Sequence, residues 1–208
     1  MKENMKQKKT FSHLKSEAKL ARQELIIEAA ERVFAVKPFN KINIRDIAKE
    51  AGISHASIYR YFPDQQSLFV EAFLQGANEI TLTLEGLIEG TKTPDVIKIS
   101  DAYITYLMDN DQYFRMMTHF MLDGSLSPEK IEKLNTAERQ IFDQFDRLFR
   151  KMKSPEPVRL LSHAFFAALN GVLITFRNYP GRTNKAVRQH MLNIARVIAR
   201  SFSDARTE

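Results

Sequence analysis

The stretch RDIAKEAGISHASIYRYF, residues 45–62, decides the fold of the N-terminal third of this chain. Apolar residues recur in it at helical spacing on both sides of Gly52, and glycine reaches positive φ without a Cβ clash, so Gly52 suits a chain reversal. Asn43 and Ser54 can each cap a following helix, because their side-chain oxygens accept hydrogen bonds from the free N–H groups of a first turn. The pattern therefore predicts two short helices joined by a tight turn, with Ile53 filling that turn.

The two predicted helices have different tasks. The first covers residues 44–50, and the second runs from Ser54 to about Tyr61, with Ile58 and Phe62 turned toward the core. Small, polar and aromatic side chains remain on the outer face of the second helix, where they can approach base edges in a major groove. Tyrosine hydroxyls near the end of this helix can reach phosphates. The outer face consists of His55, Ala56, Ser57, Tyr59 and Tyr61.

Residues 43–69, NIRDIAKEAGISHASIYRYFPDQQSLF, resemble the DNA-binding signature of TetR-family transcriptional regulators. That signature has a capped helix with Arg-Asp-Ile-Ala, then Ala-Gly-hydrophobic-Ser, then a helix end with Tyr-x-Tyr/His-Phe. With the preceding helix, the resemblance extends from about residue 21 to residue 70. It implies a helix-turn-helix whose contacts with DNA are made by Arg45, Ser54, His55, Ala56, Ser57, Tyr59, Tyr61 and Gln65.

Positive charge is concentrated in the first third of the chain. The net charge is +6, and residues 1–62 carry 13 Lys and Arg against 7 Asp and Glu, which accounts for all of it. A one-sided basic segment suits a polyanionic partner such as double-stranded DNA, although a solubilising tail has the same composition. We expect residues 1–20 to form a basic arm that is disordered up to about Ser16. This arm would compensate for Gln65, where the family usually has a lysine.

Helical spacing recurs along the whole chain, whereas no strand-like alternation persists, so the sequence predicts an all-α fold of about nine helices. Helix starts are expected at Thr93-Pro94, Ser127-Pro128 and Ser154-Pro155. In each pair a hydroxyl can cap the helix while the proline takes the first helical position, where its missing N–H is not needed.

The chain of 208 residues is longer than a usual single domain and divides into three predicted parts. Residues 1–20 are the basic arm, and residues 21–66 are a three-helix helix-turn-helix domain that binds DNA. Residues 67–208 form a helical domain, which the resemblance implies to bind an effector and to dimerise.

Two apolar helices are predicted near the C-terminus, over residues 158–177 and 184–203. The first is apolar on nearly every face, as is typical of a helix buried on two sides, and the second repeats apolar residues at i, i+4, i+7 and i+11. Two such helices per chain can build a four-helix interface in a homodimer; a large monomeric core is the alternative. The predicted dimer interface consists of Phe165, Leu169, Val172, Phe176, Val187, Met191, Ile194 and Ile198.

Methionine and phenylalanine gather in the second half of the chain, where six of the 8 methionines follow residue 100. Such side chains line adaptable apolar pockets, and they also fill ordinary cores. As a set they favour a lipophilic or aromatic effector over a sugar or a phosphate. The predicted ligand-binding residues are Tyr103, Met108, Met117, Phe120, Met121, Phe142, Phe145, His163 and Phe166.

Several classes of protein are disfavoured by the sequence. There is no cysteine, no His/Asp/Glu cluster with metal-ligand spacing, and none of the nucleophile-elbow, phosphate-loop, zincin or dinucleotide-binding motifs, so we predict no enzyme, no metal and no cofactor. The N-terminus lacks the apolar core of a signal peptide, and the longest near-apolar run, residues 164–176, is shorter than the ~20 residues that a bilayer requires. We expect a cytoplasmic protein without a membrane partner.

The function that these features favour is a ligand-responsive transcriptional repressor. A homodimer would bind a palindromic operator in double-stranded DNA, and a small lipophilic effector would release it by favouring a pose with the wrong separation of recognition helices. A DNA-binding regulator without a small-molecule ligand, either an activator or an architectural protein, is the alternative.

Overall fold

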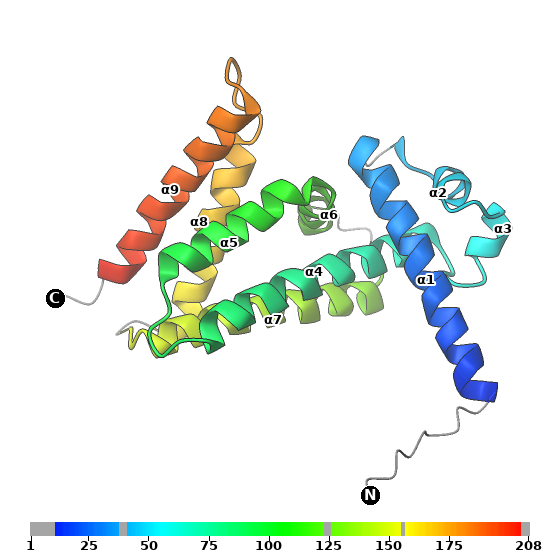
Figure 1. The fold of residues 1–208 in the computed structure, drawn as a ribbon, viewed down its shortest axis with the longest axis horizontal. Coiled ribbons are helices and arrows are strands. Elements are labelled where there is room, and N and C mark those ends of the chain that lie inside the picture. The colour runs from blue at the N-terminus through cyan, green and yellow to red at the C-terminus, as the bar shows by residue number, and fades with distance from the viewer. Residues whose placement is uncertain (1–10, 38–40, 123–125, 155–156, 205–208) are drawn as a thin grey trace, which may run out of the picture. The chain divides into compact units, whose positions relative to one another are not determined.

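The computed structural model describes residues 11–37, 41–122, 126–154 and 157–204. The regular structure of these residues is helical throughout, in agreement with the predicted all-α fold (Figure 1). The described helices are α1 (Phe11–Val36), α2 (Ile44–Glu50), α3 (His55–Ile58), α4 (Gln65–Glu89), α5 (Val96–Asp109), α6 (Asp111–Leu122), α7 (Pro128–Lys151), α8 (Val158–Phe176) and α9 (Asn184–Asp204).

Two compact units make up the chain, and the division between them falls inside α4, after Ala72. The N-terminal unit ends at Ala72 and the C-terminal unit begins at Phe73. The sequence places this boundary at residue 66. The first turns of α4 belong to the N-terminal unit because Phe69 packs edge-to-face on Phe34 of α1, with ring centroids 4.8 Å apart.

The N-terminal unit is built around one buried stripe of α1. Ile26, Ala29, Ala30, Val33 and Phe34 recur at helical spacing, and all five side chains are buried. Helix α1 begins at Phe11, so residues 11–20 are helical, in contrast to the disordered arm that the sequence predicts. The rest of the predicted arm, residues 1–10, lies outside the described residues.

The two predicted caps of the N-terminal unit, Asn43 and Ser54, are present, and Asp64 provides a third. The side chain of Asn43 accepts from Arg45 N and Asp46 N in a capping box, and Ser54 Oγ accepts from Ser57 N at 3.2 Å. Asp64 Oδ1 accepts from Ser67 N at 2.6 Å and fixes the start of α4. These local bonds satisfy first-turn N–H groups that would otherwise face water or the core unpaired.

The helix starts of the C-terminal unit agree less well with the sequence. Helix α5 is capped by the carboxylate of Asp95, which accepts from two backbone N–H groups, and not by Thr93. Helix α7 begins at Pro128 as expected, although the Ser127 hydroxyl makes no capping bond. Helix α8 follows Pro157 at its N-cap position, so the predicted cap at Ser154 is wrong.

The C-terminal unit is a helical bundle (Figure 1). Helix α7 lies along the second half of α4, where Arg147 pairs with Glu85 at 2.9 Å and Glu89 at 3.1 Å. Helix α9 packs against α5 and α8, and a bidentate pair between Arg196 and Asp101 joins α9 to α5. Helices from distant parts of the sequence therefore enclose a common core.

Helix α8 is, among the described helices, the one long and apolar enough to cross a membrane by length and composition. Its inward face is occupied within the chain, because Phe165, Leu169 and Leu173 are buried. Two polar side chains on the same helix are also buried and bonded: Ser162 to Asp146, and Asn170 to Tyr103. These contacts are those of a core helix.

Candidate nucleic-acid interface and ligand cavity

The turn between α2 and α3 has the geometry that the sequence predicts. Gly52 has a φ of 67°, in the left-handed region, and Ile53 N donates to Ala48 O at 3.0 Å to close the reversal. Ile53 itself is 36% exposed, so it does not fill the turn as expected. The fully buried Ile47 and Ile58 hold the two helices together instead.

The second helix of the motif is shorter than predicted but presents the expected face. Helix α3 ends at Ile58, and turn hydrogen bonds continue the coil to Phe62, whose N donates to Ile58 O at 3.0 Å. Ile58 and Phe62 are buried beneath it. His55, Ala56 and Tyr59 lie on the outer face, and the Tyr59 side chain is 49% exposed.

Three of the predicted DNA-contact residues already have bonds within the N-terminal unit. Ser54 and Ser57 share the cap of α3, with their hydroxyl oxygens 2.8 Å apart. The amide nitrogen of Gln65 donates to the carbonyl of Ile42 at 2.9 Å, which ties the start of α4 to the segment before α2. Arg45, in contrast, extends from the exposed side of α2.

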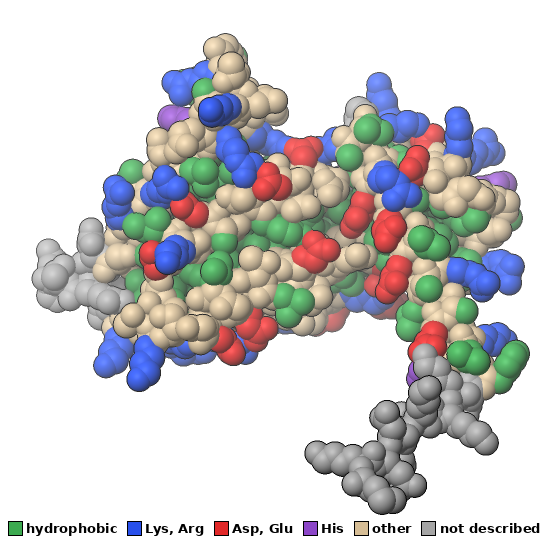
Figure 2. Space-filling model, viewed as in Figure 1, with side chains coloured by type: hydrophobic (Ala, Val, Ile, Leu, Met, Phe, Trp, Pro, Cys, Tyr) green, Lys and Arg blue, Asp and Glu red, His purple; other side chains and the backbone are tan. Residues whose placement is uncertain are grey.

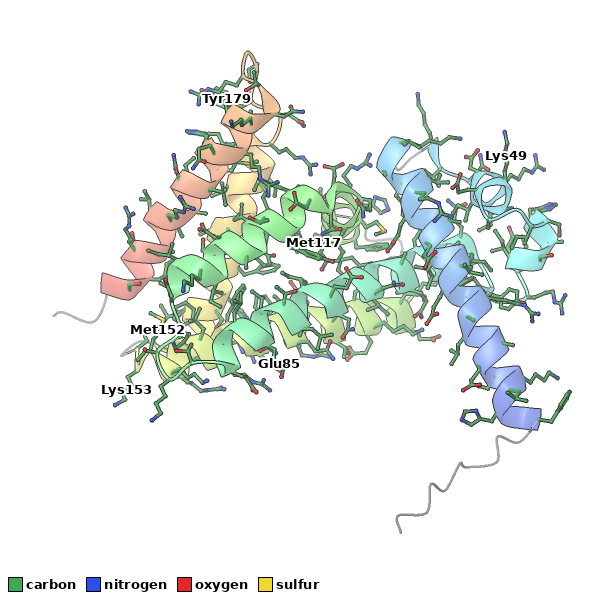
Figure 3. The ribbon with its side chains drawn as sticks, in the orientation of Figure 1. Lys49, Glu85, Met117, Met152, Lys153 and Tyr179 are labelled. Carbon is green, nitrogen blue, oxygen red and sulfur yellow. The ribbon has the colours of Figure 1, made fainter. Side chains whose placement is uncertain are left out.

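A basic hollow on the N-terminal unit was missed by the sequence analysis. Lys15, Lys19 and Arg22 follow one face of α1 and line this hollow with Arg60 and Tyr61 from the segment after α3. The i, i+4, i+7 spacing of these basic residues is visible in the sequence. It was not interpreted as one face of a helix, because no helix was expected before about Ser16. Lys and Arg side chains also gather around α2 and α3, where Figure 3 labels Lys49 (Figures 2 and 3).

The C-terminal unit contains a cavity of about 340 Å³ between α4, α6, α7 and α8. Four of the nine predicted ligand residues line it: Met117, Phe120, Met121 and Phe166. Figure 3 shows Met117 on the side of α6 that is turned toward α4 and α7. The other lining residues are Phe73, Tyr113, Leu126, Ile131, Leu134, Asn135, Glu138 and Ile141.

The other five predicted ligand residues lie elsewhere. Tyr103 is buried with its hydroxyl bonded to Asn170, and its ring packs edge-to-face on the fully buried Phe145. Phe142 packs against the exposed His163 with the rings tilted and the centroids 4.5 Å apart, outside the cavity lining. Met108 lines a different hollow, beside Arg177. These residues were predicted because Met and Phe cluster in this part of the sequence. Which of them line the cavity depends on how the helices pack against one another.

Three polar side chains on the cavity wall were not predicted from the sequence, namely Tyr113, Asn135 and Glu138, and two of them have a shifted pKa. Burial raises the pKa of the Glu138 carboxyl, while nearby His163 opposes that shift. Burial also raises the pKa of Tyr113, whose hydroxyl is buried without a hydrogen-bond partner among the described residues. No cluster of three or more potential metal ligands occurs in the described part of the chain.

Most residues of the predicted dimer interface lie inside a single copy of the chain. Phe165, Leu169, Val172, Val187 and Met191 are buried there, so they offer little surface to a second copy. The remaining three predicted residues are half-buried: Phe176, Ile194 and Ile198. The apolar stripe read from the sequence is therefore mainly the face that each helix turns toward its own core.

Residues 26–72 match the family model described as bacterial regulatory proteins, tetR family. The match begins within α1, spans α2 and α3, and ends in α4, so it coincides with the helix-turn-helix of the N-terminal unit. Residues 26–72 form a DNA-binding domain of the tetR family. This finding confirms the resemblance carried by residues 43–69.

One curated relative of this chain is an HTH-type transcriptional regulator of Haemophilus influenzae, 30% identical over 102 residues. The alignment covers 46% of this chain and 48% of the relative. The chain spans about half of the length, or less, of the first curated relatives that it matches. Their names agree with the prediction of a regulator rather than an enzyme.

Two of the solved structures that share the fold of this chain are complexes with small molecules. FadR of Bacillus subtilis in complex with stearoyl-CoA has a TM-score of 0.67 at 19% identity and covers 83% of this chain and 96% of its own. A regulator of Saccharomonospora viridis in complex with choline also has a TM-score of 0.67, at 17% identity, with 84% and 95% covered. At such identities the likeness shows the common fold alone.

Proposed function

We propose that this TetR-family chain is a ligand-responsive transcriptional repressor in the cytoplasm. It binds a palindromic operator as a homodimer, and a small apolar or aromatic effector releases it. The observation that carries the DNA-binding part is the exposed face of α3, with His55 and Tyr59 held outward by Ile58 beneath.

The contacts with DNA divide into two kinds. His55 and Ala56 lie at the start of α3, the end of a recognition helix that approaches base edges in helix-turn-helix proteins. Tyr59 and the basic hollow of Lys19, Arg22 and Arg60 suit phosphates, which fix the register of the protein without reading sequence. The basic side chains of this hollow supply positive charge in place of the lysine that the family usually has at the position of Gln65.

A homodimer is supported by a second stripe on α8, distinct from the buried one. Leu160, Ala164, Ala167, Gly171 and Ile174 recur at alternating spacings of four and three, as in a coiled-coil seam. Leu160 and Ile174 are 64% and 63% exposed in the single chain. On α9, Val197 is similarly exposed. A palindromic operator requires such pairing, because its half-sites need two recognition helices ~34–36 Å apart.

The cavity favours a ligand-responsive regulator over one without a small-molecule ligand. Its volume of about 340 Å³ falls at the lower end of the range for sites that take small molecules, and its lining is mainly apolar. Solved structures of the same fold include complexes with stearoyl-CoA and with choline. The proposal requires that a cavity ligand weaken operator binding; tighter binding would instead indicate a corepressor or an activator.

The DNA-binding part is tested with Tyr59→Phe and His55→Ala in the full chain, using DNA from upstream of its own coding region. Loss of the Tyr59 hydroxyl removes a phosphate contact, so affinity should fall about 3- to 10-fold for all sequences alike. Loss of the His55 side chain should relax discrimination at one base pair of the site. Fluorescence anisotropy with a set of single-base operator variants measures both effects.

A matched control for Tyr59→Phe is Tyr179→Phe, since Tyr179 is also exposed but lies in the turn before α9. Its affinity should equal that of the parent. Parent-like binding by both Tyr59→Phe and His55→Ala, or no sequence-selective binding by the parent itself, would refute the proposed function.

A further inference from the structure

The described lining of the cavity carries a carboxyl group but no basic side chain. Among its described lining residues Glu138 is the one ionisable carboxyl, and none is Lys or Arg. Glu138 has no ion pair or hydrogen bond within the described part of the chain. The titratable group that acts on it from α8 is His163, which is exposed and packs against Phe142 with the rings tilted. A carboxylate partly withdrawn from water in this way lacks a counter-charge.

Tyr113 supplies a second unsatisfied group at the same wall. Its ring is stacked on Phe73 with an interplanar angle of 9° and a centroid distance of 4.9 Å. The ring also lies against Gly76, where an added Cβ would come within 2.5 Å of it. The ring is therefore fixed, and its hydroxyl is buried with no partner among the described residues. Buried polar atoms are rarely left unpaired, and a ligand in the cavity that reaches this hydroxyl would give it a partner.

The remaining wall suits a positive charge on an apolar body. Phe120 and Phe166 present aromatic rings to the cavity, and a cation near such rings is attracted by their quadrupole. Met117 and Met121 adapt to the shape of an apolar group. An anionic ligand would meet the unpaired carboxyl of Glu138 with no cationic side chain of the described lining to offset it.

We propose that this cavity binds a compact lipophilic cation, namely a protonated amine on an aromatic or aliphatic body, with its N–H groups directed at Glu138 and Tyr113. The inference rests on the proposed function, since it assigns the chemical class of the effector. It excludes carboxylates and acyl thioesters of coenzyme A as occupants of the cavity.

The test measures binding to the full chain by isothermal titration calorimetry with three probes of similar size at neutral pH. They are 4-phenylbutylamine, which is protonated, neutral 4-phenylbutanol and the anion 4-phenylbutyrate. The amine should bind at least about tenfold more tightly than the alcohol, because a charge-assisted hydrogen bond is stronger than a neutral one. The anion should bind most weakly.

Two variants locate the amine. Glu138→Gln keeps the shape of the wall and should reduce the affinity for the amine about tenfold or more, bringing it close to that for the alcohol. Tyr113→Phe should reduce it about threefold to tenfold, and should leave the affinity for the N,N,N-trimethyl form of the same amine unchanged, because that form has no N–H to donate. Glu132→Gln, on the exposed side of α7, is the control and should bind the amine as the parent does.

The outcomes separate this inference from the proposed function. Equal or stronger binding of the anion, or full amine affinity in Glu138→Gln with an unchanged melting temperature, overturns the inference even if operator binding is intact. Selective amine binding that depends on Glu138 supports it. If the amine binds in this way but leaves operator binding unaltered, the ligand class stands and the effector role in the proposed function fails.

Discussion

Tyr59 and Tyr113 show how position gives the same side chain different roles. Tyr59 follows α3 and is 49% exposed, so its hydroxyl is free to meet a phosphate. Tyr113 is buried in α6, and its ring is fixed against Phe73 and Gly76. The exposure of Tyr59 could be predicted from the sequence because it follows from helical spacing around Ile58. The surroundings of Tyr113 could not, because its neighbours come from another helix.

Two glycines of α4 allow a matched test of this packing. At Gly76 an alanine Cβ would lie 2.5 Å from the ring of Tyr113, which is too close, whereas nothing lies within 4 Å of a Cβ at Gly86. We expect Gly76→Ala to lower the free energy of unfolding by about 1–3 kcal/mol through overpacking. Gly86→Ala should raise it by about 0.5–1 kcal/mol, because alanine favours an exposed helix over glycine.

Urea denaturation followed by circular dichroism measures both changes. Equal and positive effects of the two substitutions would show that the Tyr113 ring moves away without cost. In that case the ring is not fixed at the cavity wall as described.

At the scale of the helix, local bonds fix where an element starts and ends. Asn43, Ser54 and Asp64 cap the helices of the N-terminal unit as their sequence positions indicate. Asp95 caps α5 in place of Thr93, which lies two residues earlier. Both side chains can cap a helix, and local sequence alone does not decide which of two neighbouring candidates is used.

The end of α7 carries a residue in an unfavourable conformation. Lys153 has a φ of 56°, and Ser154 N donates to Phe149 O at 3.2 Å across this turn (Figure 3). A side chain at this left-handed position costs energy that glycine avoids. We expect Lys153→Gly to raise the free energy of unfolding by about 0.5–1 kcal/mol, measured by urea denaturation.

Gln140→Gly provides the contrast, since Gln140 is exposed inside the same helix. That change should lower the free energy of unfolding by about 1 kcal/mol. Destabilisation by both substitutions would mean that the left-handed turn does not limit the stability of α7.

At the scale of the whole molecule, the exposed apolar stripe of α8 is the surface through which we propose that two chains pair. If the proposed homodimer pairs through the exposed stripe of α8, we expect Ile174→Glu to convert it to a monomer, because the change places a charge in the centre of an apolar seam. Sedimentation equilibrium measures the change, and operator affinity should fall with it.

Leu82→Glu is the control for a surface charge, because Leu82 is also exposed but lies on α4. It should remain dimeric. A dimeric Ile174→Glu protein would place the interface on another face and contradict the proposed seam.

The sequence by itself determined the class of fold, the turn at Gly52 and the outward face of α3, because each follows from backbone geometry and spacing within a few residues. Only the tertiary structure decided which side of α8 is buried and which residues enclose the cavity. An all-round apolar helix such as α8 offers more than one stripe for burial, and the choice between them depends on contacts with α5, α7 and α9. For the same reason Glu138, an unremarkable acidic residue in the sequence, becomes the charged group of the cavity wall.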